Sequence, residues 1–120
     1  MHDPRSAHME VVYRILRYLK GNLGKGLWFK KNKHLMVKGY CDADWTSCPN
    51  DRRSTSGYYV FVGGNLVSWR SKKQPVVSRS TTEAEYRAMS VSVIELIWLK
   101  NLLIELKLLK NASMKLWCDN

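Results

Sequence analysis

Hydrophobic residues recur every three or four positions over residues 7–20, which predicts an amphipathic helix that ends near Gly21. Shorter apolar runs follow at 27–30 and at about 35–45, with a polar turn between them at 32–33, and both are typical of β-strands. The first part of the chain therefore predicts one helix followed by two strands.

The second part of the chain predicts a hairpin and then a long helix. The runs "GYYVFV" and "LVSWRS" flank a glycine-rich turn at 63–65, which is a strong hairpin signal. Helical spacing then extends from Ser80 to about residue 109, either continuous or broken near Lys100, and "SMKLWCD" predicts a last strand. This order of elements predicts a mixed α/β or α+β domain in which a long helix packs on a sheet.

The charge of the chain is strongly positive, with 20 Lys and Arg against 10 Asp and Glu and a formal net charge of +10. Such an excess favours a polyanionic partner, although a merely soluble basic surface is the alternative. The cations gather at 14–20, 30–33, 52–53 and 70–79, a spread that suits a broad phosphate-facing surface better than a basic tail.

The cysteines and the hydrophobic runs bear on the compartment. Cys41, Cys48 and Cys118 form no C-x-x-C pair, so reduced thiols in an intracellular protein are favoured over a metal site. The N-terminus lacks an apolar signal core, and charged residues interrupt the most hydrophobic run at 91–109. We therefore expect no membrane partner and an intracellular location, in the cytoplasm or nucleus, with an organelle left open.

Two glutamates near the start of the long helix differ in their setting. Ser80 and Glu83 fit a capping box, which is a sufficient structural explanation for Glu83. Glu85 instead lies on the apolar stripe that continues through Met89 and Ser92. A carboxylate on such a stripe needs a partner, and either a salt bridge or a bound cation would serve.

Two aspartates fall within predicted strands, where this residue type is disfavoured. Asp42 lies in "KGYCDADW" with Asp44 on the same side of the strand, and Asp119 closes "KLWCDN", although a strand end entering a turn explains each one alone. Neighbouring strands can place Asp42 beside Asp119, and a helix packed on the sheet can deliver Glu85 to the same edge. Hard divalent ions, chiefly Mg²⁺, would relieve the repulsion of three carboxylates and would support phosphodiester hydrolysis.

These residues belong to long motifs that resemble a known family. The run "KGYCDADWTSCPNDRRSTSGYYVFVGGNLVSWRSKKQPVVSRSTTEAEYRAMS", followed by "LWCDN", resembles the ribonuclease H domain of copia-type retrotransposon polyproteins, plant ones especially. The upstream "RILRYLKGNLGKGLWFK" is similar to the segment that joins reverse transcriptase to that domain. The resemblance covers nearly the whole chain and implies a connection segment at 1–33 and a partial ribonuclease H-like domain at 34–120.

The resemblance implies a mixed five-stranded sheet with helices that cleaves the RNA strand of an RNA–DNA hybrid with Mg²⁺ or Mn²⁺. By motif, the catalytic metal ligands would be Asp42, Glu85 and Asp119, with Asp44 in a supporting position.

The remaining expectations concern substrate and packing residues. The candidate nucleic-acid contacts are Arg52, Arg53, Ser78, Arg79 and Ser80, of which the two loop arginines are equally well explained as solvated and Ser80 as a helix cap. Trp45, Trp69, Trp98 and Trp117 are interpreted as packing residues rather than stacking platforms.

The resemblance also sets an expectation about activity. Domains of this family continue past the third acid with a helix, a strand and a fourth acidic ligand, whereas this sequence stops at Asn120. We therefore expect a fragment that hydrolyses hybrids weakly or not at all by itself, with the rest of the Pol polyprotein as its partner in the parent element. A non-catalytic nucleic-acid-binding remnant is the alternative, and a protein interaction module or unfolded product is a third.

Overall fold

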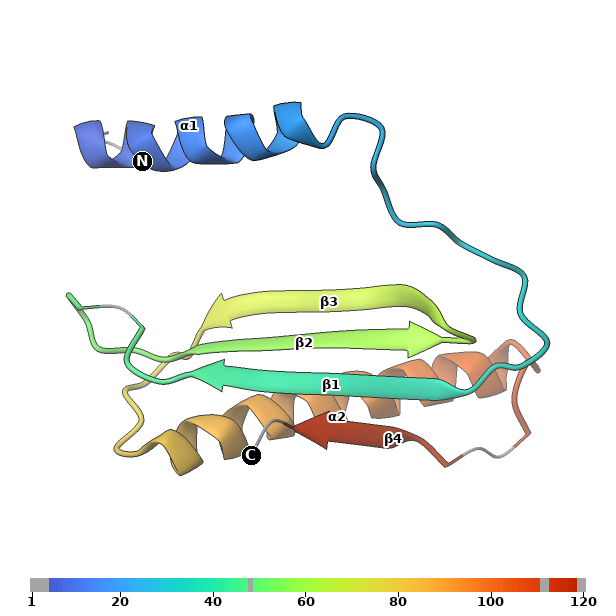
Figure 1. The fold of residues 1–120 in the computed structure, drawn as a ribbon. Coiled ribbons are helices and arrows are strands. Elements are labelled where there is room, and N and C mark those ends of the chain that lie inside the picture. The colour runs from blue at the N-terminus through green and yellow to red at the C-terminus, as the bar shows by residue number, and fades with distance from the viewer. Residues whose placement is uncertain (1–4, 48, 111–112, 119–120) are drawn as a thin grey trace.

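The computed structural model describes residues 5–47, 49–110 and 113–118, which form two helices and four strands. The elements follow one another as α1 (Ser6–Gly21), β1 (Val37–Asp44), β2 (Thr55–Val62), β3 (Asn65–Lys73), α2 (Thr81–Glu105) and β4 (Lys115–Cys118). Figure 1 shows α2 running along one side of the sheet and α1 standing apart on the other. The prediction of a mixed α/β domain with a long helix packed on its sheet is confirmed.

The sheet has the strand order β3-β2-β1-β4 and mixes two kinds of pairing. Strands β1 and β2 are antiparallel, as are β2 and β3, whereas β1 and β4 are parallel. A parallel neighbour cannot be joined by a tight turn, and α2 supplies the crossover that returns the chain to the same end of the sheet (Figure 1). β1 therefore lies between its hairpin partner and the last strand.

Strand β1 separates a buried face from an exposed one. Its residues alternate along the whole strand, so that Val37 and Cys41 are buried whereas Asp42 and Asp44 are exposed. The buried face packs on a stripe of α2 that matches the predicted one from Ser92 onward but begins with Ala84 and Ala88 in place of Glu85 and Met89. That stripe consists of Ala84, Ala88, Ser92, Leu96, Leu99 and Leu103.

The start of α2 is capped as predicted, but only in part. The amide of Glu83 donates to Ser80 Oγ at 3.1 Å. The side chain of Glu83 does not return to the Ser80 amide as a full capping box requires; its Oε2 accepts instead from the amide of Arg79 at 2.8 Å. Its Oε1 accepts from Arg87 at 2.9 Å, and these bonds hold the pKa of the Glu83 carboxyl below its ordinary value.

Two predicted elements differ in the structure. Helix α2 passes through Lys100 without a break and ends at Glu105, and Lys107 beyond it has a positive φ of 57°. Residues 27–30 form no strand, because the amide and carbonyl of Lys30 bond the side chain of Asn65 rather than a neighbouring strand. The segment between α1 and β1 is thus an extended connection that is hydrogen-bonded through Lys30 to the hairpin of β2 and β3 (Figure 1).

Helix α1 matches the predicted range but buries none of its residues and contacts no other described element. Its apolar face, which includes Val12, Ile15 and Leu16, is exposed. The division of the chain near residue 33 stays a prediction. Among the described residues, no helix is long and apolar enough to cross a membrane.

Candidate functional site

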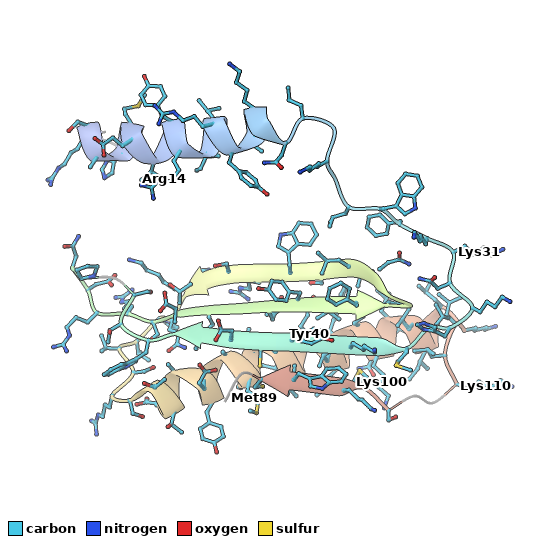
Figure 2. The ribbon with its side chains drawn as sticks, viewed as in Figure 1. Arg14, Lys31, Tyr40, Met89, Lys100 and Lys110 are labelled. Carbon is cyan, nitrogen blue, oxygen red and sulfur yellow. The ribbon has the colours of Figure 1, made fainter. Side chains whose placement is uncertain are left out.

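Asp42 lies near the end of β1 on the face of the sheet that α2 does not cover. It is exposed and borders a hollow of about 380 Å³ that β1, β2 and β4 share. Tyr40 and Trp117 line the same hollow, and their rings stack with centroids 5.1 Å apart. Figure 2 labels Tyr40 on β1, two residues before Asp42. The carboxylate of Asp42 is therefore exposed to solvent at a hollow that is lined by the stacked rings of Tyr40 and Trp117.

Glu85 approaches the same end of β1 from the side of α2. Ala84 and Ala88, which flank it in the helix, pack against Ala43 of β1. Glu85 is half-buried, and its Oε2 is removed from solvent. Its charge also contributes to raising the pKa of Cys41, which places it electrostatically close to β1. The two carboxylates thus meet the same stretch of strand from opposite faces of the sheet.

The third predicted carboxylate, Asp119, lies outside the described residues. The residue before it in the sequence, Cys118, pairs with Cys41, the residue before Asp42. Over residues 5–47, 49–110 and 113–118, no three His, Cys, Asp or Glu side chains gather closely enough to hold a metal ion together. The placement of all three acids at one point stays a prediction.

Two thiols lie beside the carboxylates. Cys41 and Cys118 are both free, and Cys41 is buried. Burial, and after it the hydrogen bond and charge of Cys118, raise the pKa of Cys41 to about 12, so this thiol is protonated at neutral pH. Mg²⁺ and Mn²⁺ favour oxygen ligands, so carboxylate oxygens are the donors at this end of β1 whose chemistry fits such ions.

The predicted substrate residues divide into exposed and buried groups. Arg52 and Arg53 are exposed in the loop between β1 and β2, and Arg79 is exposed just before α2. Ser78 is buried, and its hydroxyl donates to Gln74 Oε1 at 2.7 Å. Ser80 is exposed like the arginines, but its hydroxyl caps α2 through the bond described above. The arginines therefore reach solvent, while the two serines hold the loop and helix in place.

Sequence reasoning missed Gln74, which is buried between β3 and α2. Its Nε2 donates to Ser56 Oγ at 2.8 Å and to the carbonyl of Ala84 at 2.9 Å. Its backbone amide donates to the carbonyl of Ser54 at 2.8 Å. A polar residue followed by Pro75 reads as a turn, so the sequence offers no signal for this role.

The interpretation of the tryptophans as packing residues is wrong for two of them. Trp69 is 64% exposed and Trp98 is 56% exposed, and both project from the folded elements into solvent. The indole of Trp45, in contrast, donates to the carbonyl of Ser78 at 3.1 Å. Exposed aromatic residues therefore mark surfaces of this molecule, and sequence hydrophobicity alone assigns them to its interior.

Comparison with known proteins places the chain among retroelement sequences. It is 48% identical over 98 residues to the uncharacterized mitochondrial protein AtMg00810 of Arabidopsis thaliana. The aligned region covers 82% of this chain and 41% of that relative. It is 42% identical over 120 residues to the retrovirus-related Pol polyprotein from transposon RE1 of the same plant, covering 100% of this chain and 8% of the polyprotein. The chain thus spans less than half the length of either relative.

A third relative is covered more fully. The chain is 45% identical over 97 residues to secreted RxLR effector protein 161 of Plasmopara viticola, covering 81% of this chain and 68% of the relative. No protein-family profile matches the chain. No solved structure matches it either. On these similarities, the chain belongs to one family with effector protein 161, and its homologues include retrovirus-related Pol polyproteins, of which it matches a short segment.

Proposed function

We propose that this chain is a ribonuclease H-type segment of a retrotransposon Pol polyprotein, which hydrolyses the RNA strand of RNA–DNA hybrids with Mg²⁺ or Mn²⁺. The observation that carries the proposal is the position of Asp42 on the open face of β1 near its end, while Glu85 reaches the same stretch of the strand from the opposite, helix-covered face. There β1 lies beside β4, the strand that leads directly to Asp119. In the parent element, the remainder of the polyprotein would be its partner.

The three carboxylates of the proposed site would have different roles. Asp42, exposed over the hollow, would meet ion and substrate together, while Glu85, with one oxygen removed from solvent, would hold its position through the packing of α2 on Ala43. Asp119 would complete the ligand set. Bound divalent ions would supply an activated water and would stabilise the leaving oxygen. The exposed Arg52, Arg53 and Arg79 would bind backbone phosphates.

The proposal is tested with an end-labelled RNA–DNA hybrid, with the chain in excess over substrate so that slow turnover is visible. Cleavage of the RNA strand should require Mg²⁺ or Mn²⁺ and should fall at least about 100-fold in Asp42→Asn, because a neutral amide is a poor ligand for hard cations. Glu105→Gln is the matched control, because it removes the same charge from an exposed position at the far end of α2, and it should retain most of the activity. Metal-dependent cleavage that survives in Asp42→Asn would refute the proposal.

A second candidate is a nucleic-acid-binding remnant without catalysis, and the net charge of +10 favours it. Such a chain would bind hybrid or duplex in EDTA with an affinity that falls steeply as salt rises, yet would leave the RNA strand intact in Mg²⁺. Binding without cleavage by the folded chain would favour this candidate. Cleavage that depends on Asp42 would exclude it.

A further inference from the structure

A hollow of about 230 Å³ lies between the end of β3 and the first turns of α2, on the opposite side of the sheet from the hollow that Asp42 borders. Its walls carry Arg70, Lys72 and Lys73 from β3 and Arg87 from α2, and none of the described residues that line it is acidic. Ser90 and Gln74 add polar groups to the same walls. We call these residues the basic cleft.

The cations of the basic cleft are only partly neutralised. Lys73 Nζ lies 3.3 Å from Asp51, and Arg87 Nη2 lies 2.9 Å from Glu83. Within the described part of the chain, neither Arg70 nor Lys72 takes part in an ion pair. Like charges held around one hollow repel each other, and an anion in the hollow relieves that repulsion.

The backbone fixes where these two cations point. Arg70 and Lys72 are two residues apart on β3, so they project from the same face of the strand. Arg70 pairs with Tyr58, whose side chain is buried toward α2, and Lys72 pairs with Ser56. Both therefore face the cleft, and their side chains present charge-assisted donors to whatever occupies it.

The basic cleft lies at the same end of the sheet as the candidate site. Lys73 pairs with Thr55, and Thr55 pairs with Asp44 at the end of β1. β3 is two strands away from β1, which is about 10 Å in the plane of the sheet. The three exposed arginines of the candidate site, Arg52, Arg53 and Arg79, come from the segments that border this end.

We propose that the basic cleft binds a backbone phosphate of a nucleic-acid strand, with Arg70 and Lys72 as the ligating cations. The proposal rests on the proposed function only in taking nucleic acid as the ligand. The cleft volume of about 230 Å³ corresponds to several water molecules, at about 30 Å³ each in the liquid, and admits a phosphate group. The surrounding arginines extend the positive surface beyond what a free phosphate would contact, which favours the polymer.

The test is binding of a fluorescent RNA–DNA hybrid in EDTA, so that cleavage plays no part. The double variant Arg70→Gln/Lys72→Gln is compared with Lys107→Gln/Lys110→Gln, which removes the same charge from exposed positions that follow the far end of α2. The cleft variant should weaken binding about tenfold and lower the slope of log K against log salt by about one to two, since each phosphate contact contributes close to one. The control variant should change the affinity less than threefold.

The outcomes separate this proposal from its competitors. Equal weakening by the two double variants would show a general charge effect and overturn it. A second arm titrates inorganic phosphate against the same proteins. If the cleft variant loses phosphate binding but keeps hybrid affinity, the cleft takes small anions and the nucleic-acid assignment is wrong. Absence of cleavage by the parent chain in Mg²⁺ would favour the non-catalytic candidate over the proposed function while leaving this binding result intact.

Discussion

Gln74 Nε2 donates a hydrogen bond to the backbone carbonyl of Ala84 at 2.9 Å, inside the protein and one residue before Glu85. The carbonyl belongs to the first turns of α2, so the bond fixes the start of that helix to the end of β3. The same side chain also accepts from Ser78 Oγ and donates to Ser56 Oγ. One buried amide therefore determines how the turn that carries Glu85 meets the sheet.

Replacing Gln74 by Leu should destabilise the chain by about 1–3 kcal/mol, because buried partners lose their hydrogen bonds without gaining water. Denaturant unfolding followed by circular dichroism measures the loss. Ser71→Ala, on the exposed part of β3, is the control and should stay within about 0.5 kcal/mol of the parent. Equal stability of the Gln74 variant and the parent would mean that the buried network contributes nothing.

Ser80→Ala should lower stability by about 1 kcal/mol, since the Glu83 amide loses its cap. Thr82→Ala, an exposed change in the first turn of the same helix, should cost nothing, because alanine has the higher helix propensity. Thermal melts of both variants make the comparison. A larger loss in Thr82→Ala than in Ser80→Ala would contradict the assignment of Ser80 as the cap.

The carboxylate of Glu83 adds a pH dependence to this cap. Its folded pKa is lowered, first by the Arg79 amide and then by Arg87, so its contribution is fully present above the ordinary carboxyl pKa. That contribution is lost as the pH falls through the lowered folded value. Glu83→Gln should therefore reduce the difference in stability between neutral and acid solution, as melts over that range would measure. A variant with the pH dependence of the parent would contradict this prediction.

Gly63→Ala should be destabilising by at least about 1–2 kcal/mol, the cost of a left-handed conformation for an L-residue. Gly63 has a φ of 57°, and a Cβ built there would lie 2.6 Å from the carbonyl oxygen of His34. Gly26→Ala is the matched control, because a Cβ at that position has no atom within 4 Å. Urea unfolding should separate the two variants, and equal midpoints would contradict the strain at Gly63.

The elements that the sequence predicts well are those in which a regular spacing of apolar residues continues over many positions. The stripe of α2 follows from apolar spacing, and the β1 alternation follows from the positions around Asp42. The strand predicted at 27–30 fails because β-propensity there competes with the side chain of Asn65, 35 residues away, which takes the hydrogen bonds of Lys30. Local patterns carry no information about such a distant partner.

The candidate site divides in the same way. Asp42 and Glu85 are predicted from their unusual positions in a strand and on an apolar stripe, and the structure brings both to the end of β1. Their approach from opposite faces of the sheet could not be predicted, since it depends on which face of β1 the helix covers. The same holds for the cleft at Arg70 and Lys72, because its walls come from two separate elements.

Cys41 should resist alkylation in the folded chain far more than in the unfolded one. Burial, and after it the hydrogen bond and charge of Cys118, raise its pKa from 9.0 to about 12. At pH 8 its thiolate fraction is then roughly 10⁻⁴, against about 10⁻¹ for the ordinary value, and the thiolate is the reactive form. Brief iodoacetamide labelling with peptide mass spectrometry should show labelling of Cys41 slowed about 1,000-fold or more by folding. The same cysteine labelled in urea is the internal control.

The same shift predicts how stability changes in alkaline solution. A thiol whose folded pKa is raised adds stability that is complete below its ordinary pKa of 9.0, and that stability falls as the pH rises toward about 12. Cys41→Ala removes this dependence, although it also trims a side chain from the core formed by β1 and α2. The informative quantity is therefore the slope of unfolding free energy against pH above 9, which should be shallower in Cys41→Ala than in the parent. The prediction would be contradicted if the parent and Cys41→Ala had equal slopes of unfolding free energy against pH and if Cys41 were labelled rapidly in the folded chain. Those results would show that this thiol ionises freely and that the packing of α2 on β1 does not exclude solvent from Cys41.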